Sequence, residues 1–114
     1  MVVEDHDDSR AMMRIMIESY GYDVIEARDG LEAVEAVKSE CPGLVLMDVN
    51  MPRLDGLSAA IIIKGMDNCS DVPIVAVTAF SDFRDQALES GCVDVLPKPV
   101  EFLHLKEVIE THLT

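Results

Sequence analysis

The length, composition and charge of this chain exclude several classes of protein. Its 114 residues suffice for one hydrophobic core but not for two domains. Hydrophobic residues make up 49% and charged residues 27%, as in folded globular proteins, and no uncharged stretch approaches the length of a membrane span. The net charge of −13 argues against binding to a nucleic-acid backbone and favours cations or basic protein surfaces as partners.

The first part of the chain alternates between short apolar runs and helical repeats. Residues 1–3 are the end of a strand, and from Asp8 the apolar side chains recur every three or four residues up to Gly21, a natural helix stop. Residues 23–27 alternate briefly, which predicts a second strand. A further helical repeat begins at Leu31 and is closed by Cys41-Pro42-Gly43.

The rest of the chain continues the alternation. In order, it predicts a strand at 44–47, a helix at about 54–66, a strand at 72–77, a helix at 82–90, a strand at 93–96 and a helix at 101–112. Five strands alternating with five helices, without a linker or repeat, predict a single α/β domain over 1–114 with a doubly wound parallel sheet. Ile61, Ile62 and Ile63 cannot all face inward, so at least one is expected at the surface.

Charged and polar residues follow the apolar strands at their carboxyl ends. The first strand leads to Glu4 and Asp5, the third to Asp48, the fourth to Thr78 and the fifth to Lys98. The carboxyl ends of parallel strands form one edge of an open sheet, and ligands bind at this edge. We therefore expect three carboxylates, one hydroxyl and one ammonium group to converge there.

This set of groups fits the chemistry of phosphoryl transfer. Carboxylates held close together repel one another, and Mg²⁺ (or Mn²⁺) would relieve the repulsion, because hard cations prefer oxygen ligands. The backbone carbonyl of Asn50 could complete the ligand set. Lys98, Thr78 and an oxygen nucleophile such as Asp48 would supply the remaining parts of a phosphoryl site.

Each of these residues also has an ordinary structural explanation when it is considered alone. Asp48 is suited to capping a helix, Thr78 to ending a strand and Lys98 to the protein surface. Residues 4–8 could be a solvated acidic run, in which an exposed His6 is favoured over a metal-binding one. The functional interpretation therefore rests on the joint arrangement.

The three cysteines, Cys41, Cys69 and Cys92, have no CxxC spacing. We expect unpaired, buried or half-buried thiols, which favour a reducing cytoplasm. Residues 1–20 contain no basic segment followed by a long apolar run, so no secretory signal is expected.

Four ordered segments resemble the receiver domain of two-component response regulators. They are VVED at 2–5, LMDVNMPRLDG at 46–56, VTA at 77–79 and PKP at 97–99, and the resemblance covers essentially the whole chain. It implies a flavodoxin-like fold with strand order 2-1-3-4-5 and five flanking helices.

The resemblance also implies a role for each site residue. Asp48 would be the phosphoacceptor for a sensor histidine kinase or a phosphotransfer protein. The side chains of Asp5 and Asp48 and the carbonyl of Asn50 would hold Mg²⁺, with Glu4 acting directly or through water. Thr78 would hydrogen-bond the phosphate.

Lys98 would pair with the phosphate, and Lys98-Pro99 resembles the cis peptide bond of the family. Val95 stands where many members carry a Tyr or Phe that moves inward together with the threonine. This chain therefore has no aromatic ring at that switch position. Phe80, together with Asn50, is expected to tune how fast water reaches the acyl phosphate.

The resemblance further implies slow autodephosphorylation and a switch at the face of the fourth helix, fifth strand and fifth helix, through which a homodimer could form. Neither nucleic-acid nor membrane binding is expected of this domain. A Mg²⁺-dependent phosphohydrolase is the competing enzyme hypothesis, but such enzymes usually carry a second Asp at the position of Asn50. A receiver-like interaction domain that is not phosphorylated would be expected to lack part of the site.

Overall fold

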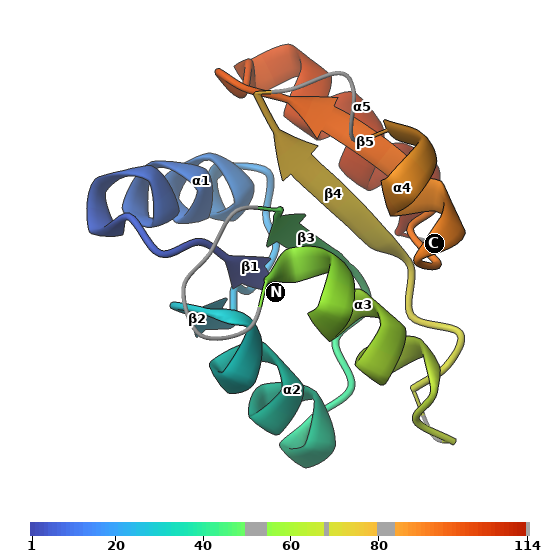
Figure 1. Cartoon of the computed structure of the whole chain (residues 1–114). Coiled ribbons are helices and arrows are strands. Elements are labelled where there is room, and N and C mark those ends of the chain that lie inside the picture. The colour runs from blue at the N-terminus through green and yellow to red at the C-terminus, as the bar shows by residue number, and fades with distance from the viewer. Residues whose placement is uncertain (50–54, 68, 80–83, 114) are drawn as a thin grey trace.

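A single parallel sheet forms the centre of the molecule (Figure 1). The computed structural model describes residues 1–49, 55–67, 69–79 and 84–113. The strands are β1 (Val2–Val3), β2 (Glu26–Ala27), β3 (Val45–Asp48), β4 (Ile74–Thr78) and β5 (Asp94–Pro97), and their order in the sheet is β2-β1-β3-β4-β5. All four strand pairs are parallel, so the predicted fold class and strand order are confirmed.

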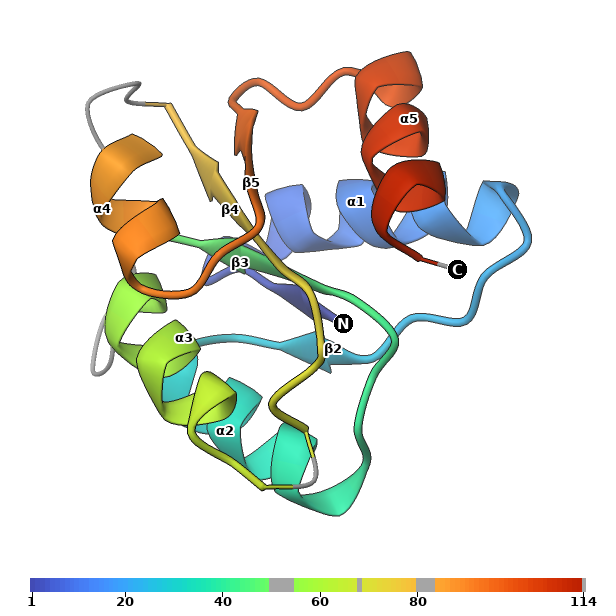
Figure 2. The same ribbon diagram turned by 90° about the vertical axis from the view of Figure 1, so that its right-hand side faces the viewer.

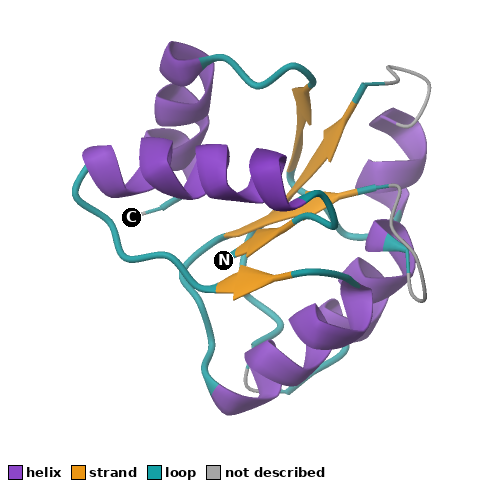
Figure 3. Ribbon diagram, turned by 90° about the vertical axis from the view of Figure 1, so that its left-hand side faces the viewer, coloured by secondary structure: helices purple, strands orange, loops and turns teal. Residues whose placement is uncertain are grey.

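The helices alternate with the strands along the chain and cover both faces of the sheet. They are α1 (Asp7–Ser19), α2 (Gly30–Ser39), α3 (Gly56–Lys64), α4 (Arg84–Glu89) and α5 (Phe102–His112). Helices α1 and α5 lie on one side of the sheet, and α2, α3 and α4 lie on the other (Figures 2 and 3). Because both faces are covered, the central strands β3 and β4 are buried along their length and apolar up to their last residue, as the uninterrupted apolar runs indicated.

Successive strand residues supply two separate cores. On the α1–α5 side the buried strand residues are Val2, Leu46, Val75, Val77 and Leu96. On the α2–α3–α4 side they are Val3, Ala27, Val45, Met47, Ile74 and Ala76. The alternation follows from the two-residue period of a strand, and burial of these side chains is the main favourable contribution to folding.

Two strands begin two or three residues later than predicted, for identifiable reasons. Residues 23–27 were expected as a strand, but β2 is an edge strand whose register matches Val2 to Glu26 and Val3 to Ala27, so only two residues pair. The run at 72–77 is a strand only from Ile74: the carbonyl of Pro73 accepts a hydrogen bond from the N–H of Val45 at 2.9 Å, but Pro73 has no N–H to donate to the ladder.

Helix α3 shows how local chemistry sets a helix start. The side chain of Asp55 accepts a hydrogen bond from the N–H of Ser58 at 2.9 Å, so the helix begins at Gly56. Ile61 and Ile62 are exposed by 59% and 43%, whereas Ile63 is fully buried, which confirms that the three isoleucines cannot all face the core.

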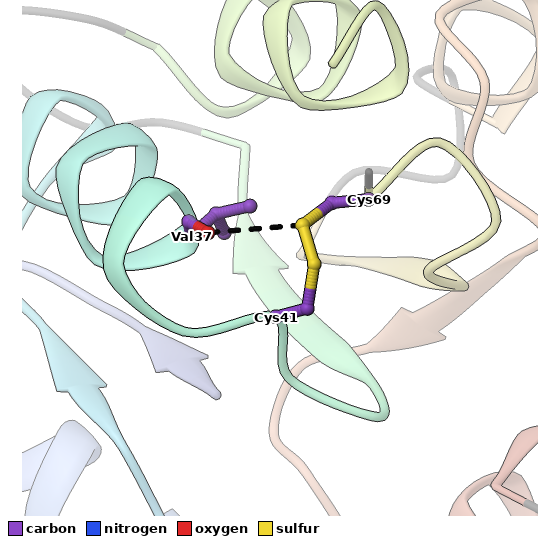
Figure 4. The surroundings of a disulfide bond; sticks show 3 residues. All are labelled: Val37, Cys41 and Cys69. Carbon is purple, nitrogen blue, oxygen red and sulfur yellow. Dashed lines mark hydrogen bonds between the residues drawn. A yellow bond between two sulfur atoms is a disulfide. The ribbon is translucent and has the colours of Figure 1, made fainter. Parts of the chain in front are cut away.

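The cysteine prediction is wrong for two of the three residues. Cys41 and Cys69 form a disulfide that joins the segment after α2 to the segment after α3 (Figure 4). Sequence spacing could not reveal the pair, because the fold brings together positions that are 28 residues apart. Cys92 is a free, buried thiol, as expected.

Gly56 lies against the end of β3, and a larger residue there should disturb the fold. A Cβ atom at this position would collide with the backbone carbonyl of Asp48 and would lie 3.0 Å from Cγ of Met47. We expect Gly56→Ala to lower the free energy of unfolding by about 2 kcal/mol, measured by urea denaturation, because backbone must shift to relieve the collision.

Gly65→Ala is the matched control for this prediction. A Cβ atom at Gly65 has its nearest neighbour at 3.5 Å, an ordinary van der Waals contact. Equal stability of the two variants would contradict the close packing of α3 on β3.

Candidate functional site

The carboxyl edge of the sheet carries the candidate site. The backbone register brings Asp48 beside Val77 and Thr78 beside Pro97. The N–H of Lys98 donates to the carbonyl of Thr78 at 2.9 Å, which fixes where the lysine leaves β5. Residues from separate strands therefore reach one edge, as the sequence predicted.

Three charged groups from three strands meet there. Nζ of Lys98 lies 3.0 Å from Oδ2 of Asp48 and 3.4 Å from Oε2 of Glu4. Glu4 and Asp48 are only 1% and 4% exposed, and the side chain of Lys98 is 30% exposed. One partly exposed ammonium group thus offsets only part of the negative charge of two buried carboxylates, which would be still less stable inside the protein without it.

The electrostatics of this triad favour an additional positive charge. Burial, followed by the neighbouring Asp48 carboxylate, raises the pKa of Glu4 to about 7, while Lys98 opposes the rise. Burial alone would lower the pKa of Lys98, but its contacts with Asp48 and Glu4 outweigh burial and raise it. Lys98 therefore stays charged, and the carboxylates still carry more charge than it balances.

Asp5 provides the observation that bears on a metal ion. Its Oδ1 atom is buried and accepts no hydrogen bond from any described residue, although Nδ1 of His6 lies 3.3 Å away. A buried carboxylate oxygen without a donor is costly unless a cation or water binds it. Ligand atoms of Glu4, Asp5 and His6 all lie within 4.8 Å of one another. An oxygen-rich cluster with an unsatisfied buried atom fits Mg²⁺ or Mn²⁺.

The remaining predicted residues have different outcomes. Thr78 is buried at the end of β4, and the side chain of His6 is 75% exposed, as expected for a residue outside the core. Val95 is half-buried and packs against the core on the α2–α3–α4 side. Asn50 and Phe80 lie outside the described residues. The Lys98–Pro99 peptide bond is cis.

Arg10 supports the site but was missed by the sequence analysis. Its Nη1 atom donates to the backbone carbonyl of Glu4 at 2.9 Å, and its Nη2 atom donates to Asp7 at 2.5 Å. Its Nε atom lies 3.4 Å from the Glu26 carboxylate. Arg10 thus ties α1 to the ends of β1 and β2, which holds Glu4 in place. Only the Asp7–Arg10 spacing along a helix could have suggested any of this.

Comparisons with known proteins agree with this geometry. Residues 1–110 match the response regulator receiver domain family. The polar-differentiation response regulator DivK of Brucella anthropi is 34% identical over 115 residues, covering 99% of this chain and 94% of DivK. DivK of Brucella ovis is 33% identical over the same shares.

Solved structures show the same fold. The receiver domain of the sensor histidine kinase PA1611 from Pseudomonas aeruginosa has a TM-score of 0.91 at 32% identity, covering 98% of this chain and 93% of that one. That receiver holds a magnesium ion in its active-site cleft. The receiver domain of NtrX from Brucella abortus has a TM-score of 0.90 at 28% identity, covering 98% and 95%.

The fold and the acidic edge define a regulatory domain rather than a conventional enzyme. The chain belongs to the response regulator receiver domain family of two-component systems. Within the described ranges, every helix is too short or too polar to cross a membrane.

The raised pKa of Glu4 predicts a pH-dependent stability. The folded, metal-free protein binds the Glu4 proton more tightly than the unfolded chain, because the pKa rises from 4.5 to about 7 on folding. Glu4 therefore stabilises the fold at acidic pH, and this contribution is lost as the pH rises through about 7. In EDTA, we expect it to account for a fall of roughly 2 kcal/mol in unfolding free energy between about pH 5 and pH 8.

Urea denaturation of Glu4→Gln across this range checks the prediction, since the variant should lose that part of the pH slope. Glu35→Gln, at a side chain that is 73% exposed, is the matched control and should keep the wild-type slope. A wild-type slope in the Glu4 variant would show that Glu4 is ionised in the folded, metal-free protein.

Proposed function

We propose that this domain is a phosphorylation-controlled switch in which Asp48 accepts a phosphoryl group. The donor would be a phosphohistidine on a sensor histidine kinase or a phosphotransfer protein. The observation that carries the proposal is the buried pair of Glu4 and Asp48 held by Lys98, together with a buried carboxylate oxygen of Asp5 that accepts no hydrogen bond from the residues the structure describes. The family match supports the same role.

The acidic residues would also hold the metal ion. The side chains of Asp5 and Asp48 and the carbonyl of Asn50 are the proposed ligands for Mg²⁺ or Mn²⁺, with Glu4 acting directly or through water. When bound, the ion supplies positive charge that screens the phosphoryl oxygens from the acidic site. The magnesium ion in the related PA1611 receiver domain supports this assignment.

The chain's own residues account for the transfer. A carboxylate oxygen of Asp48 attacks phosphorus, the phosphorus–nitrogen bond of phosphohistidine breaks, and its electron pair remains on the imidazole. Lys98, which contacts Asp48 directly, would pair with the new phosphate. The hydroxyl of Thr78, buried at the end of the neighbouring strand, would donate a hydrogen bond to it.

The phosphorylated form would act through the face of α4, β5 and α5. Leu103 on α5 is 74% exposed and Leu88 on α4 is 41% exposed, so both helices carry apolar groups at the surface that a partner or a second copy of the chain could contact. Val95 lies in β5 at the position of the family's aromatic switch residue, so here Thr78 would carry the local rearrangement without a ring. Phe80 and Asn50 would set the rate of slow autodephosphorylation. The domain would act in the cytoplasm.

The phosphohydrolase alternative is disfavoured by its need for an acid–base group. The expected position of that group is Asn50, whose side-chain amide cannot transfer protons. A receiver-like domain that is never phosphorylated is disfavoured because the described part of the site retains both buried carboxylates and the lysine.

Incubation with acetyl phosphate and Mg²⁺, followed by intact mass measurement, tests the proposal. The wild type should gain one phosphoryl group that persists for seconds or longer and should gain none in EDTA. Asp48→Asn should remain folded and unlabelled, because an amide is not a nucleophile for phosphorus. Asp8→Asn, an exposed change in α1, is the matched control and should be labelled like the wild type.

Full labelling of Asp48→Asn would remove the assignment of the phosphoacceptor. Rapid turnover of an added phosphoester by the wild type, without a lasting adduct, would instead favour the phosphohydrolase.

A further inference from the structure

The Cys41–Cys69 disulfide lies at the opposite end of β3 from Asp48. Cys41 follows α2 and is exposed, whereas Cys69 follows α3 and is only 2% exposed. Their Cα atoms are 5.8 Å apart, and the bond joins the segments that follow two neighbouring helices (Figure 4). The two sulfurs therefore differ in access: one belongs to an exposed residue and the other to a buried one.

The surroundings of Cys69 suit its reduced form as well. Its Sγ atom lies 3.7 Å from the carbonyl oxygen of Val37 in α2 (Figure 4). A disulfide sulfur carries no proton and cannot donate to that oxygen, but a thiol can, weakly. A hydrogen-bond acceptor is therefore already placed for Cys69 once the disulfide is reduced.

A surface hollow lies beside the two cysteines. It has a volume of about 490 Å³, and both cysteines line it together with Asp71, Pro73 and His112. A hollow of this size admits a small thiol or the active-site segment of a protein reductant.

We propose that Cys41–Cys69 is a reversible redox site, at which a thiol reductant attacks the Cys41 sulfur. The proposal rests in part on the proposed cytoplasmic function, because disulfides of reducing compartments are usually transient and redox-sensing rather than permanent. The exposed Cys41, the hollow and the acceptor for Cys69 are the structural grounds.

The exchange balances as a two-electron reduction. A reductant thiolate forms a bond to Sγ of Cys41 while the Cys41–Cys69 bond breaks, and the electron pair goes to Sγ of Cys69. The Cys69 thiolate then takes a proton from solvent, and the resulting thiol donates a hydrogen bond to the carbonyl oxygen of Val37. A second reductant thiolate then attacks the mixed disulfide and releases Cys41 as a thiol, and the reductant leaves as a disulfide.

The redox state should change the stability of the segment that carries the phosphoacceptor. The loop closed by the bond runs from 41 to 69 and contains β3, Asp48 and α3. A cross-link of this length restricts the unfolded chain, so its reduction should lower Tm by about 10 °C.

To test this proposal, the full chain is equilibrated in buffers with different ratios of reduced glutathione to oxidised glutathione. Free thiols are then trapped by alkylation and counted by intact mass measurement. We expect two thiols to appear together as the buffer becomes reducing, in a folded protein whose Tm is lower by about 10 °C. Cys41→Ser should have the low Tm at every ratio. Cys92→Ser, the matched control, should respond like the wild type.

Two results would overturn the proposal: a disulfide that never forms at any ratio, or one that stays intact in the folded protein at the most reducing ratio. Labelling by acetyl phosphate is measured in parallel on both redox forms. Failure of labelling in both forms would count against the phosphoacceptor assignment and leave the redox result standing, whereas redox failure with normal labelling would count against this site alone.

Discussion

The structure depends on an imbalance of buried charge at one edge of the sheet. Glu4 and Asp48 are almost completely removed from water, and Lys98 contacts both of them. One ammonium group cannot neutralise two carboxylates, and the pKa of Glu4 rises to about 7 in consequence of its burial and of Asp48 beside it. Apolar side chains would be less costly to bury at these positions. The presence of the charged groups therefore indicates that they serve a function.

The parallel sheet explains why these groups meet although they are far apart in sequence. Helices on both faces bury the strands along their length, so polar side chains are accommodated only where the strands end. Parallel strands end on the same side of the sheet. Asp48 pairs with Val77, so Thr78, the next residue of β4, lies at the same edge as Asp48. Gly56 allows α3 to begin directly against Asp48, and Arg10 holds the carbonyl of Glu4 from α1. Fold and site are thus products of the same packing.

The sequence predicted those parts of the molecule that depend on periodicity and on strand ends. The alternation of strands and helices and the convergence of Glu4, Asp48 and Lys98 followed from apolar runs that stop at charged residues. The disulfide did not follow, because the Cys41–Cys69 contact depends on how α2 and α3 pack side by side. The short pairing of β2 likewise depends on its partner β1, because only Val2 and Val3 of β1 pair with it. The sequence of residues 23–27 alone cannot predict that limit.

In the proposed function, acidic groups at the ends of β1 and β3 would share one divalent cation beside Asp48, the proposed nucleophile. Anomalous diffraction from crystals grown with Mn²⁺ would locate this ion, because the manganese signal does not depend on the positions assigned to the protein atoms. We expect one strong peak within coordination distance of the carboxylates of both Asp5 and Asp48. A peak at Glu4, Asp5 and His6 that leaves Asp48 out, or no peak at this edge, would contradict it.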